Sequence, residues 1–101
     1  MTKNFKDFAT EDRRLVILRV LKDQESYSLN CSVMQMVLQQ FGHGVSRDQV
    51  RTDYAWLAEQ DLLTVERLSD TVHVAKITAR GVDVAKGLAT TPGVKRPGPE
   101  G

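Results

Sequence analysis

The sequence predicts a mainly α-helical fold that is completed by a small β-hairpin, an α+β arrangement. Several stretches of the 101-residue chain place apolar residues at the three- and four-residue spacing of amphipathic helices. Residues 64–77 are instead rich in valine and contain the turn signal Ser69-Asp70. A chain of this length forms one domain. The expected order is helix, short strand, helix, helix, strand, strand, helix.

The first expected helix follows an N-terminal arm, residues 1–9. Thr10 is its expected N-cap, and Glu11 and Asp12 add negative charge at the positive end of the helix dipole. Its apolar face is expected to comprise Leu15, Ile17, Leu18, Val20 and Leu21. Its polar side is expected to carry Arg13, Arg14, Arg19 and Lys22. A very short strand is expected at residues 27–29.

Asn30 is the expected N-cap of the second helix, and Gly42 supplies the left-handed residue that ends it. The apolar side chains of this helix recur at helical spacing and are expected in the core: Val33, Met34, Val37, Leu38 and Phe41.

The third helix has the most definite start. Ser46 and Gln49 have the S-x-x-Q spacing of a capping box, and Val45 and Val50 occupy the positions of a hydrophobic staple. The helix is therefore expected over residues 47–60. Its buried stripe and the two leucines after it are Val50, Tyr54, Leu57, Leu62 and Leu63. Its opposite face is expected to expose Asp48, Arg51, Thr52, Ala55 and Glu59.

After the hairpin, Thr78 is the expected N-cap of a last short helix that stops at Gly87. The folded domain is then expected to span residues 10–87. Residues 88–101 are rich in Pro and Gly and lack apolar periodicity, so they are expected to form a disordered tail.

Composition argues against several classes of function. The formal net charge is +1, so any DNA binding must come from local patterning rather than from a strongly basic domain. We expect no enzyme, because there is neither a Gly-rich phosphate loop nor a His–carboxylate–nucleophile set. Cys31 is the single cysteine and His43 and His73 are isolated, so no metal and no cofactor are expected. The absence of a long apolar run favours a cytoplasmic protein with no membrane partner.

The order of the expected elements is that of a winged helix-turn-helix. The segment "SRDQVRTDYAWLAEQDLLTVE" resembles the third helix and first wing strand of MarR/ArsR-like regulators, and "ITARGVDVAKG" is similar to the "LTxxGxxxA" segment that follows their wing. With its "PGVKRP" tail, the chain also resembles small proteins of Mu-like phages and prophages that are labelled ArsR-family regulators. The resemblance implies a DNA-binding transcriptional regulator that places helix 47–60 in the major groove of double-stranded DNA and uses hairpin 64–77 as its wing.

The resemblance places the candidate DNA contacts on the third helix and the hairpin. Arg47 and Arg51 lie in the first turns of the helix, where base edges and phosphates are contacted. Arg51 is suited to a guanine, Thr52 to a phosphate or base, and Ala55 to a thymine methyl. The wing candidates are Arg67, His73 and Lys76. The alternative interpretation is a solvated face of mixed charge.

Two classes of function follow from these observations. A regulator of this size is expected to act as a homodimer, with Phe5 and Phe8 either at the dimer contact or folded back on their own domain. The alternative is that the chain is a winged-helix protein-interaction module of a phage or prophage and does not bind DNA.

Cys31 is either a redox-sensing thiol or a small buried hydrophobe. Lys95 and Arg96 either attract phosphates or keep the tail soluble.

Overall fold

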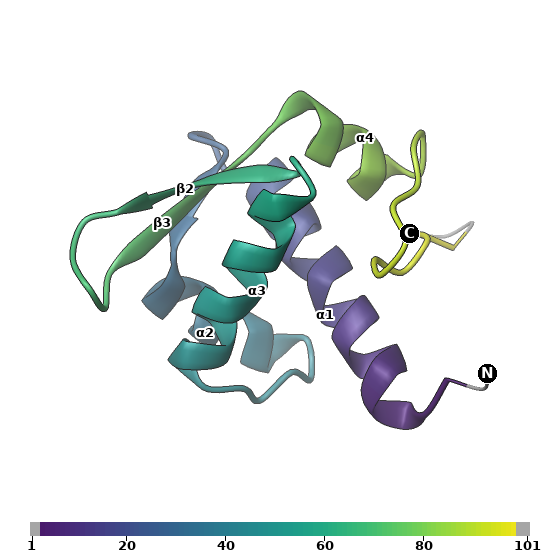
Figure 1. The fold of residues 1–101 in the computed structure, drawn as a ribbon, viewed down its shortest axis with the longest axis horizontal. Coiled ribbons are helices and arrows are strands. Elements are labelled where there is room, and N and C mark those ends of the chain that lie inside the picture. The colour runs from purple at the N-terminus through teal and green to yellow at the C-terminus, as the bar shows by residue number, and fades with distance from the viewer. Residues whose placement is uncertain (1–2, 99–101) are drawn as a thin grey trace.

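The computed structural model describes residues 3–98. Its elements follow in the order α1 (Phe5–Lys22), β1 (Ser28–Asn30), α2 (Cys31–Gln40), α3 (Arg47–Glu59), β2 (Leu63–Arg67), β3 (His73–Ile77) and α4 (Ala79–Lys86) (Figure 1). This arrangement confirms the predicted α+β class and the predicted order of elements.

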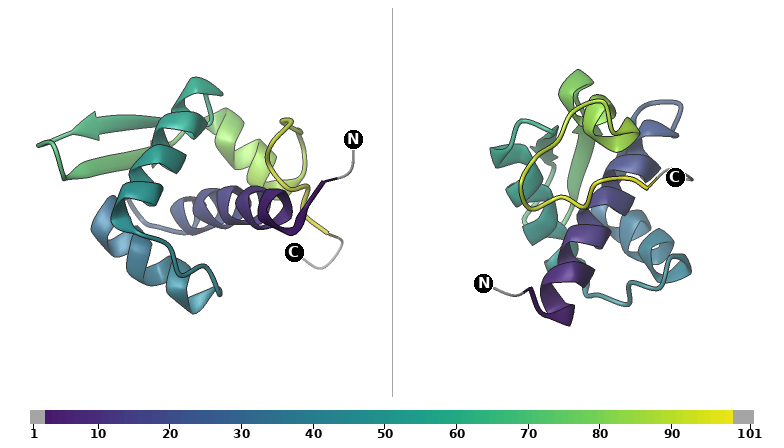
Figure 2. Two further views of the ribbon diagram at one scale, coloured as in Figure 1. Left: turned by 60° about the horizontal axis from the view of Figure 1, so that its bottom comes forward. Right: turned by 90° about the vertical axis from the view of Figure 1, so that its right-hand side faces the viewer.

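The three strands form an antiparallel sheet in the order β1-β3-β2. The β2–β3 hairpin projects away from the helices as a wing (Figures 1 and 2). Its register runs from Leu63 opposite Ile77 at the base to Arg67 opposite His73 at the outer end. Strand β1 begins one residue later than predicted, because Tyr27 has a left-handed backbone with φ of 59°.

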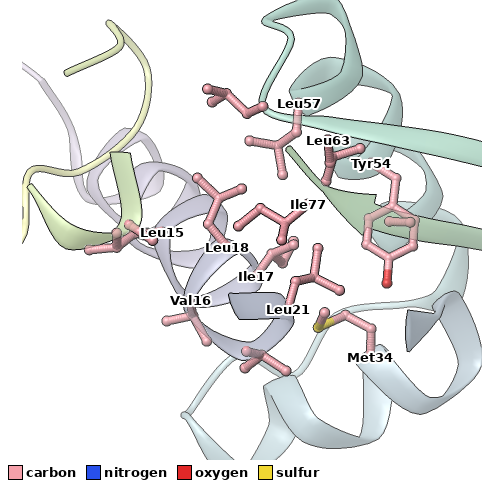
Figure 3. Packing of buried hydrophobic residues seen from close by; sticks show 14 of the residues in the cluster. Leu15, Val16, Ile17, Leu18, Leu21, Met34, Tyr54, Leu57, Leu63 and Ile77 are labelled. Atoms are coloured by element: carbon pink, nitrogen blue, oxygen red, sulfur yellow. The ribbon is translucent and has the colours of Figure 1, made fainter. Parts of the chain in front are cut away.

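The core lies between α1, α2, α3 and one face of the sheet (Figure 3). Its largest fully buried side chains include Leu15, Ile17, Leu18, Leu21, Met34, Leu38, Tyr54, Leu57, Leu62 and Leu63. The Tyr54 hydroxyl donates a hydrogen bond to the backbone carbonyl of Leu29 at 3.0 Å, which satisfies this polar atom. Burial raises the pKa of Tyr54 far above its ordinary value, so the phenol stays neutral.

The core prediction for α2 is wrong at both ends of its apolar face. Val33 is 39% exposed and Phe41 is 58% exposed. The helix ends at Gln40, so the backbone turns at Phe41 and carries its side chain away from the buried stripe.

The helix starts at Cys31, Arg47 and Ala79 are set by the predicted N-caps. Asn30, Ser46 and Thr78 each accept a hydrogen bond from the backbone N–H three residues later. The reciprocal half of the expected capping box at α3 is wrong. The Gln49 side chain does not return to Ser46 but donates to Asp53 Oδ1 at 3.1 Å.

Helix α1 begins at Phe5, so the expected arm over residues 1–9 is wrong from that residue onward. Asn4 is the N-cap: its side chain accepts from the Asp7 backbone N–H at 2.9 Å, and the Asp7 carboxylate accepts from the Asn4 backbone N–H at 3.4 Å. This reciprocal capping box starts the helix earlier than Thr10. Residues 1–2 lie outside the described part of the chain.

Residues 88–98, which we call the strap, pack across α1 and α3, so the prediction of a disordered tail is wrong for them. Thr91 and Val94 are buried. The backbone N–H of Lys95 donates to the Glu11 carbonyl at 3.1 Å. The strap therefore adds to the fold through contacts that its sequence pattern does not reveal. Residues 99–101 of the expected tail lie outside the described residues.

Arg13 is the polar residue of α1 that the sequence places most poorly. It was expected on the solvent side, but it is 7% exposed and paired with Asp53 of α3, which is 2% exposed. Arg13 Nη2 lies 3.1 Å from Asp53 Oδ1, and Arg13 Nε donates to the other carboxylate oxygen. This bidentate pair fixes α1 against α3.

Candidate nucleic-acid interface

The solvent-facing side of α3 is the first part of the candidate interface. Arg47, Asp48, Thr52 and Ala55 are exposed on it, as the helical spacing predicts. Arg47 lies in the first helical turn and makes no hydrogen bond or ion pair within residues 3–98 that would hold its guanidinium. It is therefore a cation available to a phosphate or a base edge.

Arg51, unlike Arg47, has its guanidinium held by two partners within the fold. Its Nη1 donates to the backbone carbonyl of Thr71 at the wing tip, at 3.2 Å, and its Nη2 lies 3.4 Å from Asp48 Oδ1. The side chain is 20% exposed. Arg51 thus links α3 to the wing, and a contact with guanine requires it to exchange these partners.

A hollow of 300 Å³ separates α3 from the wing. It is lined by Arg51, Ala55, Ala58, Val65, Arg67 and His73. Residues directly opposite each other on antiparallel strands point to the same face of the sheet, so the Arg67–His73 pair and the Val65–Ala75 pair both face α3. Arg67 is exposed there and adds a second basic group beside the helix.

Lys76 lies apart from the other candidates. It is opposite Thr64 of β2 and Ser28 of β1, one residue out of phase with the face that meets α3. The alternation of side chains therefore places Lys76 on the outer face of the sheet. Sequence reasoning assigned it to the wing correctly but did not determine which face it occupies, because that depends on the strand register.

Thr71 connects the wing tip to the helices, and the sequence analysis did not identify this residue. Its carbonyl accepts from Arg51 of α3 and also from Cys31 Sγ at the start of α2, at 3.3 Å. Cys31 is 1% exposed, and this burial favours the small-hydrophobe interpretation over a redox sensor. The sequence carries no signal for these contacts because they join residues 20 and 40 positions apart.

The charge on this surface is mixed but locally basic. Arg47, Arg67 and the tethered Arg51 lie toward the start of α3 and the wing, whereas Glu59 is at the far end of the helix. His73 lines the hollow, and its Nε2 atom is buried without a hydrogen-bond partner among the described residues.

Within residues 3–98 no helix is long and apolar enough to span a membrane.

The fold and this surface define a winged helix-turn-helix protein. No family model matches the sequence. The chain is 54% identical over 93 residues to the uncharacterized protein gp26 of Escherichia phage Mu. The aligned residues cover 92% of this chain and 95% of that protein. The chain therefore belongs to the family of Mu gp26. It is also 51% identical over 77 residues to an uncharacterized protein of Haemophilus influenzae, across 76% of this chain and 74% of that one.

A solved complex structure of hsRosR-S1 has a similar fold. The TM-score is 0.58 and the identity 18%, over 69% of this chain and 61% of that chain. This likeness supports the winged-helix architecture. The two sequence relatives carry no MarR or ArsR description, so the resemblance to those regulators is supported for the fold and not for the family label.

Proposed function

We propose that this protein is a DNA-binding transcriptional regulator of a bacterial phage or prophage that acts in the cytoplasm. The observation that carries the proposal is the exposed start of α3, where Arg47 is unpaired within residues 3–98 and Arg67 of the wing lies on the same side. An α-helix fits the major groove, and a wing beside it reaches the phosphates. Arg47, Thr52 and Ala55 are the proposed groove contacts.

The wing contacts follow from the strand register. Arg67 is proposed to meet a phosphate, because it shares the hollow with α3. Arg51 is proposed to position the wing relative to the helix and to contact DNA only after it leaves Thr71. Lys76 is proposed as a peripheral phosphate contact, since it faces away from α3.

A single winged-helix module buries too little surface on DNA for tight specific binding, so we propose that the protein binds as a homodimer. Two-fold symmetry would then place one α3 in each of two half-sites, about 34 Å or a multiple of it apart on the duplex.

The test is fluorescence anisotropy of a labelled random-sequence duplex, titrated with protein at low and moderate salt. We expect affinity to fall steeply with salt, because phosphate contacts release counterions. Arg47→Ala should weaken binding on all sequences and reduce the salt slope by about 1. Lys86→Ala, which removes an exposed cation from α4, is the matched control and should bind as the wild type does.

Two results would overturn the DNA proposal. One is the absence of binding at low salt. The other is an equal loss of affinity in Arg47→Ala and Lys86→Ala, because that would show a charge effect unrelated to α3.

A second candidate function is supported by the apolar wing tip. Leu68 is 61% exposed and Val72 is 39% exposed there. A protein partner would cover them. Two results together would support this interaction-module function instead. The wild-type protein would not bind DNA, and the Leu68→Ser variant would fail to bind a protein partner that the wild type binds.

A further inference from the structure

Three basic side chains converge on the hollow between α3 and the wing, which we call the wing hollow. Arg51 lines it from α3, whereas Arg67 and His73, which lie opposite each other on β2 and β3, line it from the wing. The rest of the lining is small and apolar: Ala55, Ala58 and Val65. Apolar walls lower the local dielectric and strengthen the electrostatic effect of the basic groups.

No carboxylate balances these groups among the described residues that line the wing hollow. Asp48 lies 3.4 Å from Arg51 Nη2, but its side chain is 85% exposed and does not line the hollow. Glu66 precedes Arg67 on β2 and therefore points to the opposite face of the sheet. An anion is the ligand that this charge distribution favours.

Both arginines have hydrogen-bond donors left for such an anion. Arg67 is exposed, and no ion pair or hydrogen bond within residues 3–98 holds its guanidinium. An arginine carries five N–H donors, of which Arg51 uses one from Nη1 for Thr71 and one from Nη2 for Asp48. Arg51 therefore keeps donors for an anion while it stays bound to the wing tip.

His73 has an unused hydrogen-bonding atom, which is the observation that points most directly to a ligand. Its Nε2 is buried and has no partner among the described residues. A buried polar atom without a partner is destabilising, so native proteins retain few of them. Because His73 lines the wing hollow, a small rotation of its ring brings Nε2 to an oxygen bound there.

We propose that the wing hollow is a binding site for a phosphate group, held by Arg51, Arg67 and His73. Guanidinium and imidazole N–H groups are charge-assisted donors to phosphate oxygens. Donors from three side chains on three elements suit the tetrahedral oxygens of a phosphate better than the two coplanar oxygens of a carboxylate. The volume of 300 Å³ is at the lower end of the range for small-molecule pockets, which suits a phosphate or a small phosphate ester.

A phosphate bound in the wing hollow bridges α3 to both strands of the wing. It thereby fixes the position of the wing against the helix. The inference goes beyond the proposed function, because a free phosphate occupies the site without DNA.

The first test is a titration with sodium phosphate at constant pH and without DNA, with sodium chloride of equal ionic strength as the reference. The imidazole resonances of the two histidines are followed by NMR. Those of His73 should shift along a saturable curve, with a dissociation constant on the order of millimolar, because so small a ligand makes few contacts. His43 is the internal control: its Nε2 already lies 2.7 Å from Asp12, so its resonances should not follow that curve.

Two variants test the donors. Arg67→Gln should raise the dissociation constant at least tenfold, whereas Lys86→Gln, which removes an exposed cation of α4, is matched in charge and should leave it unchanged. His73→Phe is tested by thermal unfolding, because a ligand that binds only the folded state raises the melting temperature. Without phosphate this variant should melt no lower than the wild type, since it removes an unpaired buried polar atom. With phosphate it should gain much less than the wild type does.

Binding to a labelled duplex distinguishes two sources of the phosphate group. If the DNA backbone supplies it, phosphate should weaken duplex binding more than chloride of equal ionic strength does, and His73→Phe should weaken it as well. If a free phosphate or phosphate ester supplies it, duplex affinity should be the same in both salts and in His73→Phe.

The outcomes separate this inference from the proposed function. A His73 shift that does not saturate, an equal shift of His43, or equal affinities in Arg67→Gln and Lys86→Gln would overturn the phosphate site. Duplex binding that depends on Arg47 would still support the proposed function in that case. A saturable phosphate site in a protein that binds no DNA would support the wing hollow and overturn the DNA proposal.

Discussion

At the scale of single residues, the buried Arg13–Asp53 pair is the most consequential contact that the sequence conceals. Both side chains are at least nine-tenths buried, and Gln49 donates a further hydrogen bond to the same carboxylate. The carboxylate therefore meets three donor atoms. Buried charges are tolerated only when they are paired and hydrogen-bonded in this way. Asp53 belongs to α3, so loss of the pair would also disturb the helix proposed to read DNA.

We expect Asp53→Ala to lower the free energy of unfolding by about 3–5 kcal/mol, because it leaves the Arg13 guanidinium buried without its partner. Urea unfolding followed by Trp56 fluorescence measures the change, since this is the single tryptophan. The control is the double variant Arg13→Met/Asp53→Leu, which removes both charges and should be much less destabilised. Equal losses in the two variants would show that packing, and not the unpaired charge, determines the effect.

At the scale of elements, the base of the wing is fixed by the start of α4. A Cβ added at Gly81 would lie 2.0 Å from the backbone oxygen of Leu62 and 2.6 Å from Ile77 Cγ1. The Thr78 side chain caps this helix and also donates to the Asp61 carbonyl at 2.8 Å. Only glycine at position 81 lets α4 approach the strand so closely.

We expect Gly81→Ala to lower the free energy of unfolding by roughly 1–3 kcal/mol, because the backbone of Leu62 must move to admit the methyl group. A Cβ at Gly44 would meet nothing within 4 Å, so Gly44→Ala is the matched control and should be neutral or slightly stabilising. Thermal unfolding compares the two. A neutral Gly81→Ala would mean that α4 and β2 adjust freely.

Helix caps and helix faces were predictable from the sequence, whereas contacts between elements were not. The caps Asn30, Ser46 and Thr78 were predictable because their hydrogen bonds close over three residues. The start of α1 was misplaced because only Thr10 was considered as its N-cap, although the Asn4–Asp7 capping box also closes over three residues. The candidate site was half predictable. Helical periodicity identified the exposed face of α3, whereas the tether of Arg51 and the outward face of Lys76 depend on tertiary contacts and register.

At the scale of the whole molecule, the strap joins the end of the chain to its beginning. Arg14 of α1 lies between the Trp56 ring, 3.7 Å from its centroid, and the Gly93 carbonyl, to which it donates at 2.9 Å. Gly93 has φ of 93°, and a Cβ there would lie 2.7 Å from Trp56. The Arg14–Gly93 hydrogen bond joins residues 79 positions apart, so local composition could indicate only the Pro- and Gly-rich character of the strap.

Asp12 is the second link between the strap and the rest of the fold. Its carboxylate lies 2.7 Å from His43 Nε2 of the α2–α3 loop and 3.2 Å from Lys95 Nζ of the strap. Burial alone would raise the pKa of Asp12, but the hydrogen bonds from His43 and Lys95, with their charges, lower it below its ordinary value of 3.8. The folded state thus holds the carboxylate ionised more strongly than the unfolded chain does.

The stabilisation from Asp12 is therefore complete above the unfolded pKa of 3.8 and is lost as the pH falls through the lower pKa of the folded state. We expect Asp12→Asn to lower the free energy of unfolding by about 0.5–1 kcal/mol at pH 7, as for a partly exposed ion pair. The difference from the wild type should shrink toward zero as the pH falls below that folded-state pKa. Urea unfolding at a series of pH values measures it, with Asp70→Asn at the exposed wing tip as control. A difference that persists unchanged at low pH would mean that Asp12 acts through packing and that its charge does not hold the strap to α1.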